Sequence, residues 1–429
     1  MPPGSVAVGA SLVVAGASAY GFLVIAARAL GPAEYAPLSV LWALALLAGP
    51  GFFLPLEQEV ASAMAARRAR GEGGGPVFRK AATLGLGLLA ALVVLGLVAS
   101  TVLTRQLFSG QWLLLAAWLV SLAGACLAHL ARGTLSGQGR FNAYARFIAG
   151  ESAFRCLLAG ALAVAGVSTA GLYGMAVAVG PILALSVALG GQSGLVEPGP
   201  PAPWAEVSTA LAWLLLGSVM SMALVNAGPL AMELLAGPGE NAEAGRFLAG
   251  LVVARVPLFL FQAVQAALLP RLSRLAGEGR FGELRESLGR LIVALSAIAV
   301  LGVAVAGAAG PQVVELLFGS EFRLGARTMA LLGAGSGAFM VASAVAQANI
   351  ALGSHRRMAV AWGAGFVALA GVTTLSSSDL FLRVELGGLA GGVAALVAQL
   401  VVLRAASRAG AVLDPDNVVE ALVDLRLEP

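Results

Sequence analysis

The sequence predicts an all-α polytopic membrane protein with about twelve transmembrane helices in two parallel-repeat six-helix bundles. Of its 429 residues, 59% are hydrophobic and only 11% are charged, whereas about 25% of residues are charged in soluble globular chains. The apolar runs are long and do not alternate with a period of two, which favours helices over a closed barrel. The basic residues lie between these runs, as the positive-inside rule expects.

Each expected span is an apolar run long enough to cross a hydrocarbon core of about 30 Å, which takes about 20 residues of helix. A very short turn near Gly166 separates the fifth span from the sixth, and the eleventh runs into Ser376. The twelve predicted spans are 5–27, 36–60, 82–104, 112–131, 147–167, 170–190, 207–232, 247–269, 289–309, 326–350, 358–376 and 386–404.

The distribution of charge predicts the orientation. If the N-terminus is cytoplasmic, the segments on that side hold 18 of the 26 basic residues and the opposite segments hold six, while Arg155 and Arg255 fall within spans. This asymmetry predicts a multi-pass protein of the cytoplasmic membrane with both termini inside. The first residues lack the basic region of a cleavable signal, so the first run is expected to be a retained helix. Basic residues spread in this way do not indicate a nucleic-acid partner.

Weak internal similarity predicts that the two halves are repeats. The segment 68–73 resembles 274–279, and 31–34 resembles 237–240, both at an offset of 206 residues. Because each half has six helices, an even number, the halves should share one orientation, with a substrate cleft between them. The expected parts are an N-terminal bundle (1–192), a stiff linker (193–206), a C-terminal bundle (207–405) and a cytoplasmic tail (406–429) with a short amphipathic helix from Asp414.

Five loop motifs, taken in chain order, carry a family resemblance. They are Arg28-Ala-Leu-Gly-Pro-Ala-Glu-Tyr35, Arg132-Gly-Thr-Leu-Ser-Gly-Gln-Gly-Arg-Phe141, Glu243-Ala-Gly-Arg-Phe247, Leu269-Pro-Arg-Leu-Ser273 and Leu317-Phe-Gly-Ser-Glu-Phe322. The chain resembles the polysaccharide-flippase (Wzx-like) branch of the multidrug/oligosaccharidyl-lipid/polysaccharide (MOP) exporter superfamily over about residues 5–405. The resemblance implies two bundles and a cleft lined by the first, second, seventh and eighth helices. Many relatives carry an acidic residue in the seventh helix, where this chain has Asn226.

The resulting hypothesis is a flippase that exports lipid-linked oligosaccharide or polysaccharide units by alternating access, with no catalytic activity. A multidrug-type antiporter is the first alternative, although it would be expected to have a carboxylate deep in the first or seventh helix. A membrane glycosyltransferase, polysaccharide polymerase or scaffold is the second alternative. Beyond substrate and lipid, polysaccharide-synthesis enzymes could be partners, and a monomer is expected. The spacing of Cys126, Cys156, His129 and His355 does not suggest a metal site, and we expect no cofactor.

Charged residues inside spans are the sharpest site candidates. Arg255 lies deep in the eighth span, where an arginine costs about 2.5–3.5 kcal/mol on insertion scales, so it should bind a diphosphate or acidic sugar or else pair structurally. Arg28 is either a cavity residue or an interfacial anchor at the outer end of the first helix. Glu151 and Arg155 are four residues apart and should form an ion pair on one helix face, with a cavity role as the alternative.

Other polar residues in spans have two readings each. Glu57 and Glu59 either pair with Arg67 or Arg68 at the interface or couple transport to a proton or cation. The neutral side chains Asn226, Gln262 and Gln265 are candidates for sugar contacts, although hydrogen bonds between helices explain them equally well.

Overall fold

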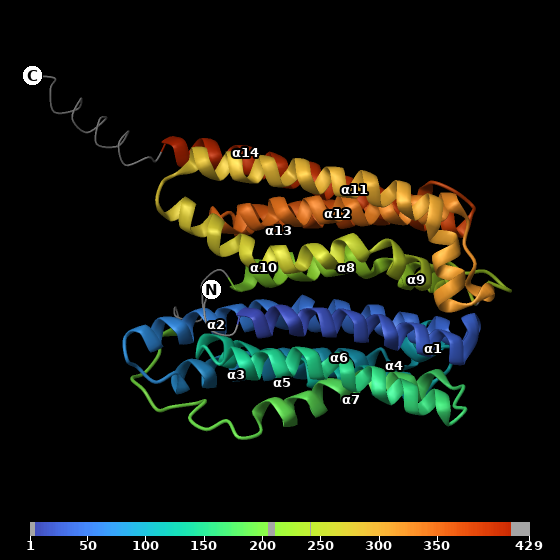
Figure 1. Cartoon of the computed structure of the whole chain (residues 1–429), viewed down its shortest axis with the longest axis horizontal. Coiled ribbons are helices and arrows are strands. Elements are labelled where there is room, and N and C mark those ends of the chain that lie inside the picture. Colours follow the sequence, from blue (N-terminus) through green and yellow to red (C-terminus); the bar gives the residue numbers. More distant parts are fainter. Residues whose placement is uncertain (1–4, 205–210, 241, 413–429) are drawn as a thin grey trace, which may run out of the picture. The chain divides into compact units, whose positions relative to one another are not determined.

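The computed structural model describes residues 5–204, 211–240 and 242–412, and all the regular structure in these ranges is helical (Figure 1). The elements are α1 (Ser5–Ala48), η1 (Gly49–Phe53), α2 (Leu54–Ala69), α3 (Gly75–Val98), α4 (Ser100–Val102), η2 (Leu103–Leu107), α5 (Trp112–Gly137), α6 (Phe141–Val164), α7 (Ala170–Leu189), α8 (Leu211–Leu235), α9 (Glu243–Ala254), α10 (Val256–Gly277), α11 (Phe281–Phe318), η4 (Ser320–Phe322), α12 (Ala326–Ala351), α13 (His355–Leu375) and α14 (Leu380–Val412). The segments η1 and η2 are π-helical turns and η4 is a 3₁₀ turn. The expected amphipathic helix from Asp414 lies outside the described residues.

Ten helical stretches of the described chain are long and apolar enough to cross a membrane. The first, Ala7–Ala69, has 63 residues and covers two of the predicted spans. The predicted eighth span is not among the ten, because it is divided into α9 and α10 at Arg255. Counting the first stretch twice and α9–α10 once accounts for all twelve predicted spans.

A reversal at Gly31 divides α1 into two antiparallel arms. Gly31 has φ 69° and ψ 167°, a backbone conformation that glycine adopts without steric cost, and Pro32 follows it. The rings of Phe22 and Trp42, one from each arm, stack with their centroids 5.5 Å apart. The first predicted loop, built on Gly31 to Glu34, is therefore a tight helical hairpin.

The described residues group into two compact units, whose boundaries differ from the expected division. Unit 1 comprises residues 1–253 and 309–325, and unit 2 comprises residues 254–308 and 326–429. Helices α8 and α9 thus group with the first six spans, because α8 packs against α1, α2 and η1. This grouping by contacts is not a comparison of repeats, so the proposed bundle limits stay a prediction.

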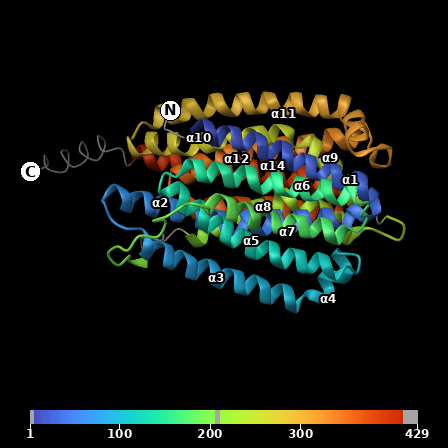
Figure 2. The same ribbon diagram turned by 60° about the horizontal axis from the view of Figure 1, so that its bottom comes forward.

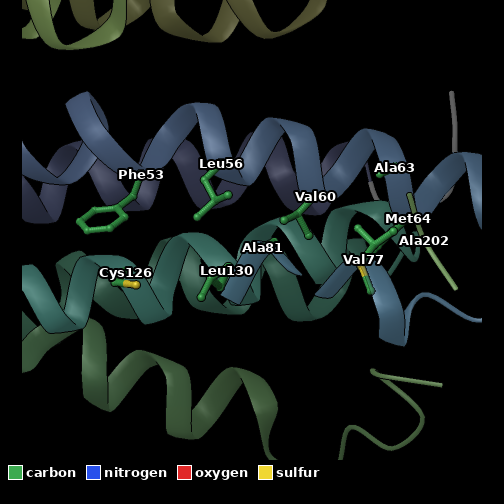
Figure 3. Close-up of a cluster of buried hydrophobic side chains, with 10 residues drawn as sticks. All are labelled: Phe53, Leu56, Val60, Ala63, Met64, Val77, Ala81, Cys126, Leu130 and Ala202. Atoms are coloured by element: carbon green, nitrogen blue, oxygen red, sulfur yellow. The ribbon is translucent and has the colours of Figure 1, made fainter. Parts of the chain in front are cut away.

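In unit 1, α5 and α6 flank α7, and α1 packs against α6 and α8 (Figure 2). The buried side chains between α2, α3 and α5 form a single cluster, shown in Figure 3, that includes Leu56, Val60, Val77, Cys126 and Leu130. This apolar packing fixes α2 against α5 and α3.

The segment 193–204, which belongs to the predicted stiff linker, is docked onto helices of unit 1. The Gly75 amide donates to the Glu197 carbonyl at 2.8 Å, and Arg67 donates to the Pro200 carbonyl at 2.8 Å. Arg140 donates to the Ser193 carbonyl at 2.6 Å. Proline-rich sequence leaves carbonyls without helical partners, and basic side chains of unit 1 supply the missing donors.

In unit 2, α14 contacts both α12 and α13, and a buried amide pair joins the three helices. Asn349 on α12 donates to the side chain of Gln399 on α14 at 2.8 Å, and Gln399 donates to the Met358 carbonyl on α13 at 3.1 Å. Both amide side chains are fully buried. Such interhelical hydrogen bonds stabilise membrane bundles, in which lipid offers no alternative partner.

Candidate functional site

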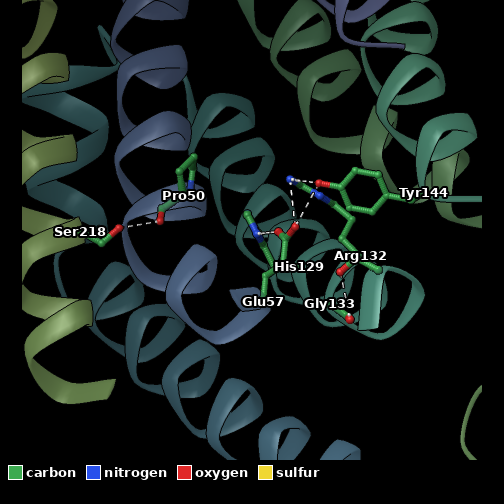
Figure 4. A network of polar contacts seen from close by, with 8 residues as sticks. Pro50, Glu57, His129, Arg132, Gly133, Tyr144 and Ser218 are labelled. Carbon is green, nitrogen blue, oxygen red and sulfur yellow. Dashed lines mark hydrogen bonds and ion pairs between the residues drawn. The ribbon is translucent and has the colours of Figure 1, made fainter. Parts of the chain in front are cut away.

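A buried polar network in unit 1 brings together one carboxylate, one imidazole, one guanidinium and one phenol (Figure 4). The Glu57 carboxylate on α2 lies 2.7 Å from His129 Nδ1 and 3.2 Å from Arg132 Nη2, both on α5. Tyr144 on α6 donates to Glu57 at 3.4 Å and accepts from Arg132 at 3.3 Å. Three helices therefore supply one cluster of titratable groups inside the membrane-spanning part of the chain.

The backbone of α2 places Glu57 at the start of a regular helix. The π-helical turn η1 precedes α2, and Pro55 occupies its first turn, where the missing N–H costs nothing. The Pro50 carbonyl of this turn accepts the Leu54 amide and also the Ser218 hydroxyl of α8, the latter at 3.0 Å (Figure 4). The hydroxyl of α8 thus stabilises the irregular turn that sets the position of Glu57.

Close approach of α5 to α2 depends on two glycines. A Cβ atom on Gly133 would lie 2.7 Å from the Glu57 carbonyl, and one on Gly137 would lie 2.7 Å from the Ala61 carbonyl. Glycines four residues apart let helix backbones approach closely in membranes. His129 precedes Gly133 by one turn, so the same face of α5 carries the imidazole to Glu57.

The network holds opposite charges in a medium where an unpaired charge is costly. The Glu57 side chain is 8% exposed and the His129 side chain is 7% exposed. The Arg132 guanidinium lies next to the carboxylate and over the Tyr144 ring. The Glu57 carboxylate is satisfied by Arg132 and by its contact with the His129 imidazole. Chemically, the cluster holds a carboxylate and an imidazole within hydrogen-bonding distance, which is the arrangement that a proton transfer between them would need.

The expected interfacial partners of Glu57 were wrong. Arg67 lies 1% exposed and donates instead to the carbonyls of Gly73 and Pro200, and Arg68 donates to the Gln138 carbonyl. These hydrogen bonds tie the end of α2 to neighbouring loop carbonyls, while Glu57 is satisfied by His129 and Arg132. Glu59, two positions on, is half-buried.

His129, Arg132 and Tyr144 were missed as site residues. Arg132 was counted with the loop arginines after a span that ended at 131, but α5 continues to Gly137 and keeps Arg132 inside the helix. His129 was treated only as lacking metal-ligand spacing. His129 and Arg132 are three residues apart, so their side chains are neighbours on one face of α5. This spacing is the sequence signal that could have identified them as a polar pair.

The ion pair expected from Glu151 and Arg155 is formed, on α6. Arg155 also donates to the Val177 carbonyl at 3.3 Å and lies over the Trp42 ring, 5.9 Å from its centroid. A carboxylate, a carbonyl and an aromatic face together satisfy the guanidinium within unit 1. The pair accordingly holds α6 to α7 and α1.

Arg28 anchors one end of unit 1. Its guanidinium donates to the carbonyls of Leu316 and Leu317, at the C-terminal end of α11, and the distance to the latter is 2.6 Å. Arg246 donates to the Glu321 carbonyl at 2.9 Å. Cations at a helix C-terminus are favourable because carbonyls there lack partners. This geometry matches the anchor rather than the cavity alternative for Arg28.

Of the remaining candidates, Asn226 belongs to unit 1, whereas Arg255 and Gln265 belong to unit 2. Arg255 is half-buried at the break between α9 and α10, two residues before Pro257. Proline in the first turn of α10 explains this, because a helix can begin there but cannot run through it unchanged. Asn226 is buried and donates to the Met222 carbonyl of its own helix at 3.0 Å. Gln265 is half-buried on α10, and the Gln262 side chain lies outside the described residues.

A second buried carboxylate, missed from the sequence, belongs to unit 2. Glu385, in the first turns of α14, is 2% exposed, and Thr328 at the start of α12 faces it. The predicted twelfth span began at 386, which placed Glu385 in a loop, whereas α14 begins at Leu380. Arg132 and Glu385 were missed for the same reason, because α5 and α14 extend beyond the apolar runs from which their spans were predicted.

The fold is that of the MATE transporters of the MOP superfamily, with two repeat bundles, and the predicted fold class is thereby confirmed. The chain superposes on an inward-facing multidrug resistance MATE family transporter with a TM-score of 0.70 at 17% identity, covering 93% of this chain and 94% of the other. An outward-facing structure gives a TM-score of 0.69, also at 17% identity, covering 95% of each chain. The Vibrio cholerae MATE transporter VcmN gives 0.65 at 14% identity, covering 93% and 95%.

Relatives in sequence are mycobacterial. The chain is 27% identical over 376 residues to "Uncharacterized protein Rv1510" of Mycobacterium tuberculosis, covering 85% of this chain and 84% of that protein. It is 26% identical over 415 residues to "Uncharacterized protein Mb3654" of Mycobacterium bovis, covering 93% and 92%. No family model matches the chain. The structural neighbours are transporters rather than enzymes, and the chain has the fold of a multi-pass membrane transporter.

Proposed function

We propose that this chain exports lipid-linked oligosaccharide or polysaccharide units across the cytoplasmic membrane by alternating access. The saccharide head would cross within the protein while the lipid tail stays in the bilayer. The transporter fold and the ordered loop motifs of the flippase branch support the proposal. A multidrug-type antiporter with the same fold is the competing function.

We favour the flippase over the multidrug-type antiporter because the first and seventh helices lack the deep carboxylate that a cationic drug would need. The first arm of α1, from Ser5 to Leu30, contains no acidic residue. In α8 the buried polar side chain is the neutral amide of Asn226, and the acidic residue of this helix, Glu233, lies in its last turn. Farther into unit 1, Glu57 faces Arg132 and Glu151 faces Arg155. Carboxylates neutralised by arginines attract cations poorly, and this favours a neutral or anionic substrate.

Arg255 is our candidate for the substrate's diphosphate. A guanidinium binds two phosphate oxygens at once, and its charge offsets part of the cost of moving the diphosphate out of water. Helical geometry is interrupted at this residue, with φ −91° and ψ 1°, so the backbone there is not committed to a regular helix.

The test is translocation of a labelled lipid-linked oligosaccharide in proteoliposomes, read by its accessibility to an enzyme added outside. Wild-type protein should translocate the lipid; Arg255→Lys should retain part of the rate and Arg255→Ala should lose most of it. Arg290→Ala is the matched control, because Arg290 is exposed and pairs with Glu286 on its own helix. Wild-type rates in Arg255→Ala at equal abundance would contradict the assignment of Arg255.

Coupling to a proton through Glu57 and His129 is the second part of the proposal. Their 2.7 Å contact lets one proton pass between carboxylate and imidazole without a large change in position. An imposed pH gradient should accelerate wild-type translocation and leave Glu57→Gln unaccelerated. Glu151→Gln should respond as the wild type does, because the Glu151 and Arg155 pair holds helices together rather than exchanging protons.

A further inference from the structure

A groove between α13 and α14 has apolar walls and two arginines at one end. Its cavity volume is about 520 Å³, and its lining includes Arg356, Arg357, Val360, Ala364, Ala398 and Val401. Alanine at 364 and 398 leaves the groove hollow where larger side chains would fill it. Val360 and Val401 are 61% and 60% exposed, so the walls present apolar surface outward.

The arginines occupy a position that helix electrostatics disfavours. Arg356 and Arg357 lie in the first turn of α13, where the helix dipole already supplies positive potential. The first turn contains no acidic residue, and Ser354 makes no side-chain cap. Two cations together with the first amides of a 21-residue helix create a local preference for an anion.

The groove has the dimensions of a lipid rather than of a small anion. His355–Leu375 is itself one of the membrane-length stretches. In a bilayer we therefore expect its first turn at the level of the headgroups and its next turns in hydrocarbon. From Arg357 to Ala364 the helix rises about 10 Å, which is roughly half the length of an acyl chain. A molecule with an anionic head and an apolar tail would match both ends of the groove.

We propose that this groove binds an anionic glycerophospholipid, with its phosphate on Arg356 and Arg357 and one acyl chain along Ala364 and Ala398. Basic sites between transmembrane helices at a membrane surface bind anionic headgroups. The charge of the site selects anionic over zwitterionic lipid, and the hollow wall holds the chain in place. A bound lipid would bridge α13 and α14 without being transported.

The experiment titrates the purified full-length protein in detergent with dioleoyl-phosphatidylglycerol and counts bound lipids by native mass spectrometry. Dioleoyl-phosphatidylcholine and inorganic phosphate are the comparison probes. We expect one phosphatidylglycerol to bind more tightly than phosphatidylcholine. Arg356→Gln with Arg357→Gln should weaken that binding about 30-fold, and either change alone about fivefold. Lysine at both positions should keep part of the affinity, which separates loss of charge from loss of fold.

Two controls make the result specific. Arg79→Gln with Arg285→Gln removes the same charge from exposed positions on α3 and α11, and it should leave the affinity unchanged. Ala364→Phe fills the groove while keeping both arginines, and it should weaken the binding of phosphatidylglycerol. Unchanged binding in the Arg356 and Arg357 double variant would overturn the proposal. Competition by inorganic phosphate together with full binding in Ala364→Phe would also overturn it, because the site would then hold a free anion only.

Discussion

Glu57 and His129 meet at 2.7 Å although 72 positions separate them in the chain. The contact exists because Gly133, one turn after His129, lets α5 approach the backbone of α2 so closely that a Cβ atom there would lie 2.7 Å from the Glu57 carbonyl. Arg132 then compensates the carboxylate from the same helix. Packing, charge and a candidate proton site are thus determined by one short stretch of α5.

Breaking the buried pair of Glu57 and Arg132 should be strongly destabilising. Glu57→Gln leaves a guanidinium without its carboxylate and should cost about 3–5 kcal/mol of unfolding free energy. Glu57→Gln with Arg132→Gln should recover much of that loss, because both charges are removed together. Unfolding temperatures of the four proteins in one detergent give the double-mutant cycle. Strict additivity of the two single changes would contradict a direct interaction.

Gly133→Ala should displace α2 from α5 and cost about 1–3 kcal/mol, as overpacking does in well-packed cores. Gly87→Ala on α3 is the matched control, since nothing lies within 4 Å of a Cβ atom there. The control should be neutral or slightly stabilising because alanine favours helix. Equal unfolding temperatures for the two variants would show that the close approach has no energetic role.

The predicted orientation can be tested by single cysteines in a background without Cys126 and Cys156. Cysteines at Arg79, Gly277 and Gly282 should be protected from an impermeant thiol reagent in intact cells, whereas those at Ser109 and Ser320 should react. Gly277 and Gly282 have open space around a Cβ atom. The physical basis is the excess of basic residues on the side predicted to be cytoplasmic. Labelling of the first group would reverse the topology.

Asp379 should stabilise α14 in a pH-dependent way. It accepts the Leu382 amide at 3.0 Å, and this hydrogen bond, followed by the charge of Arg327, lowers the pKa of the carboxyl. A lowered pKa means that the stabilisation is present above the unfolded value, about 3.9, and is lost as pH falls through the folded value. Asp379→Ala should therefore cost about 1 kcal/mol near pH 7, discounted for exposure.

The difference in unfolding temperature between wild type and Asp379→Ala should shrink below about pH 4. Asp379→Asn keeps a capping side chain without the charge, so it isolates the electrostatic part. If the difference in unfolding temperature stays constant across this pH range, the charge of Asp379 contributes nothing and the stabilisation comes from the capping hydrogen bond alone.

The sequence predicted the helical class and eleven of the twelve spans because apolar length is a direct requirement of the bilayer. It predicted the Gly31 reversal and the Glu151–Arg155 pair because both are local, involving residues within a few positions. The network around Glu57 depends on α2, α5 and α6 meeting in space, which periodicity within one helix cannot specify. Arg132 and Glu385 were missed because charged residues near a span's end were assigned to loops, whereas α5 and α14 extend past the apolar run.

The most direct test presents both candidate substrates to the same proteoliposomes. We expect a labelled lipid-linked oligosaccharide to be translocated at a rate that depends on Arg255 and on an imposed pH gradient. A lipophilic cationic dye should move no faster than in vesicles without protein. Dye transport that depends on this protein, with no translocation of the lipid-linked saccharide, would contradict the account and identify a multidrug-type antiporter instead.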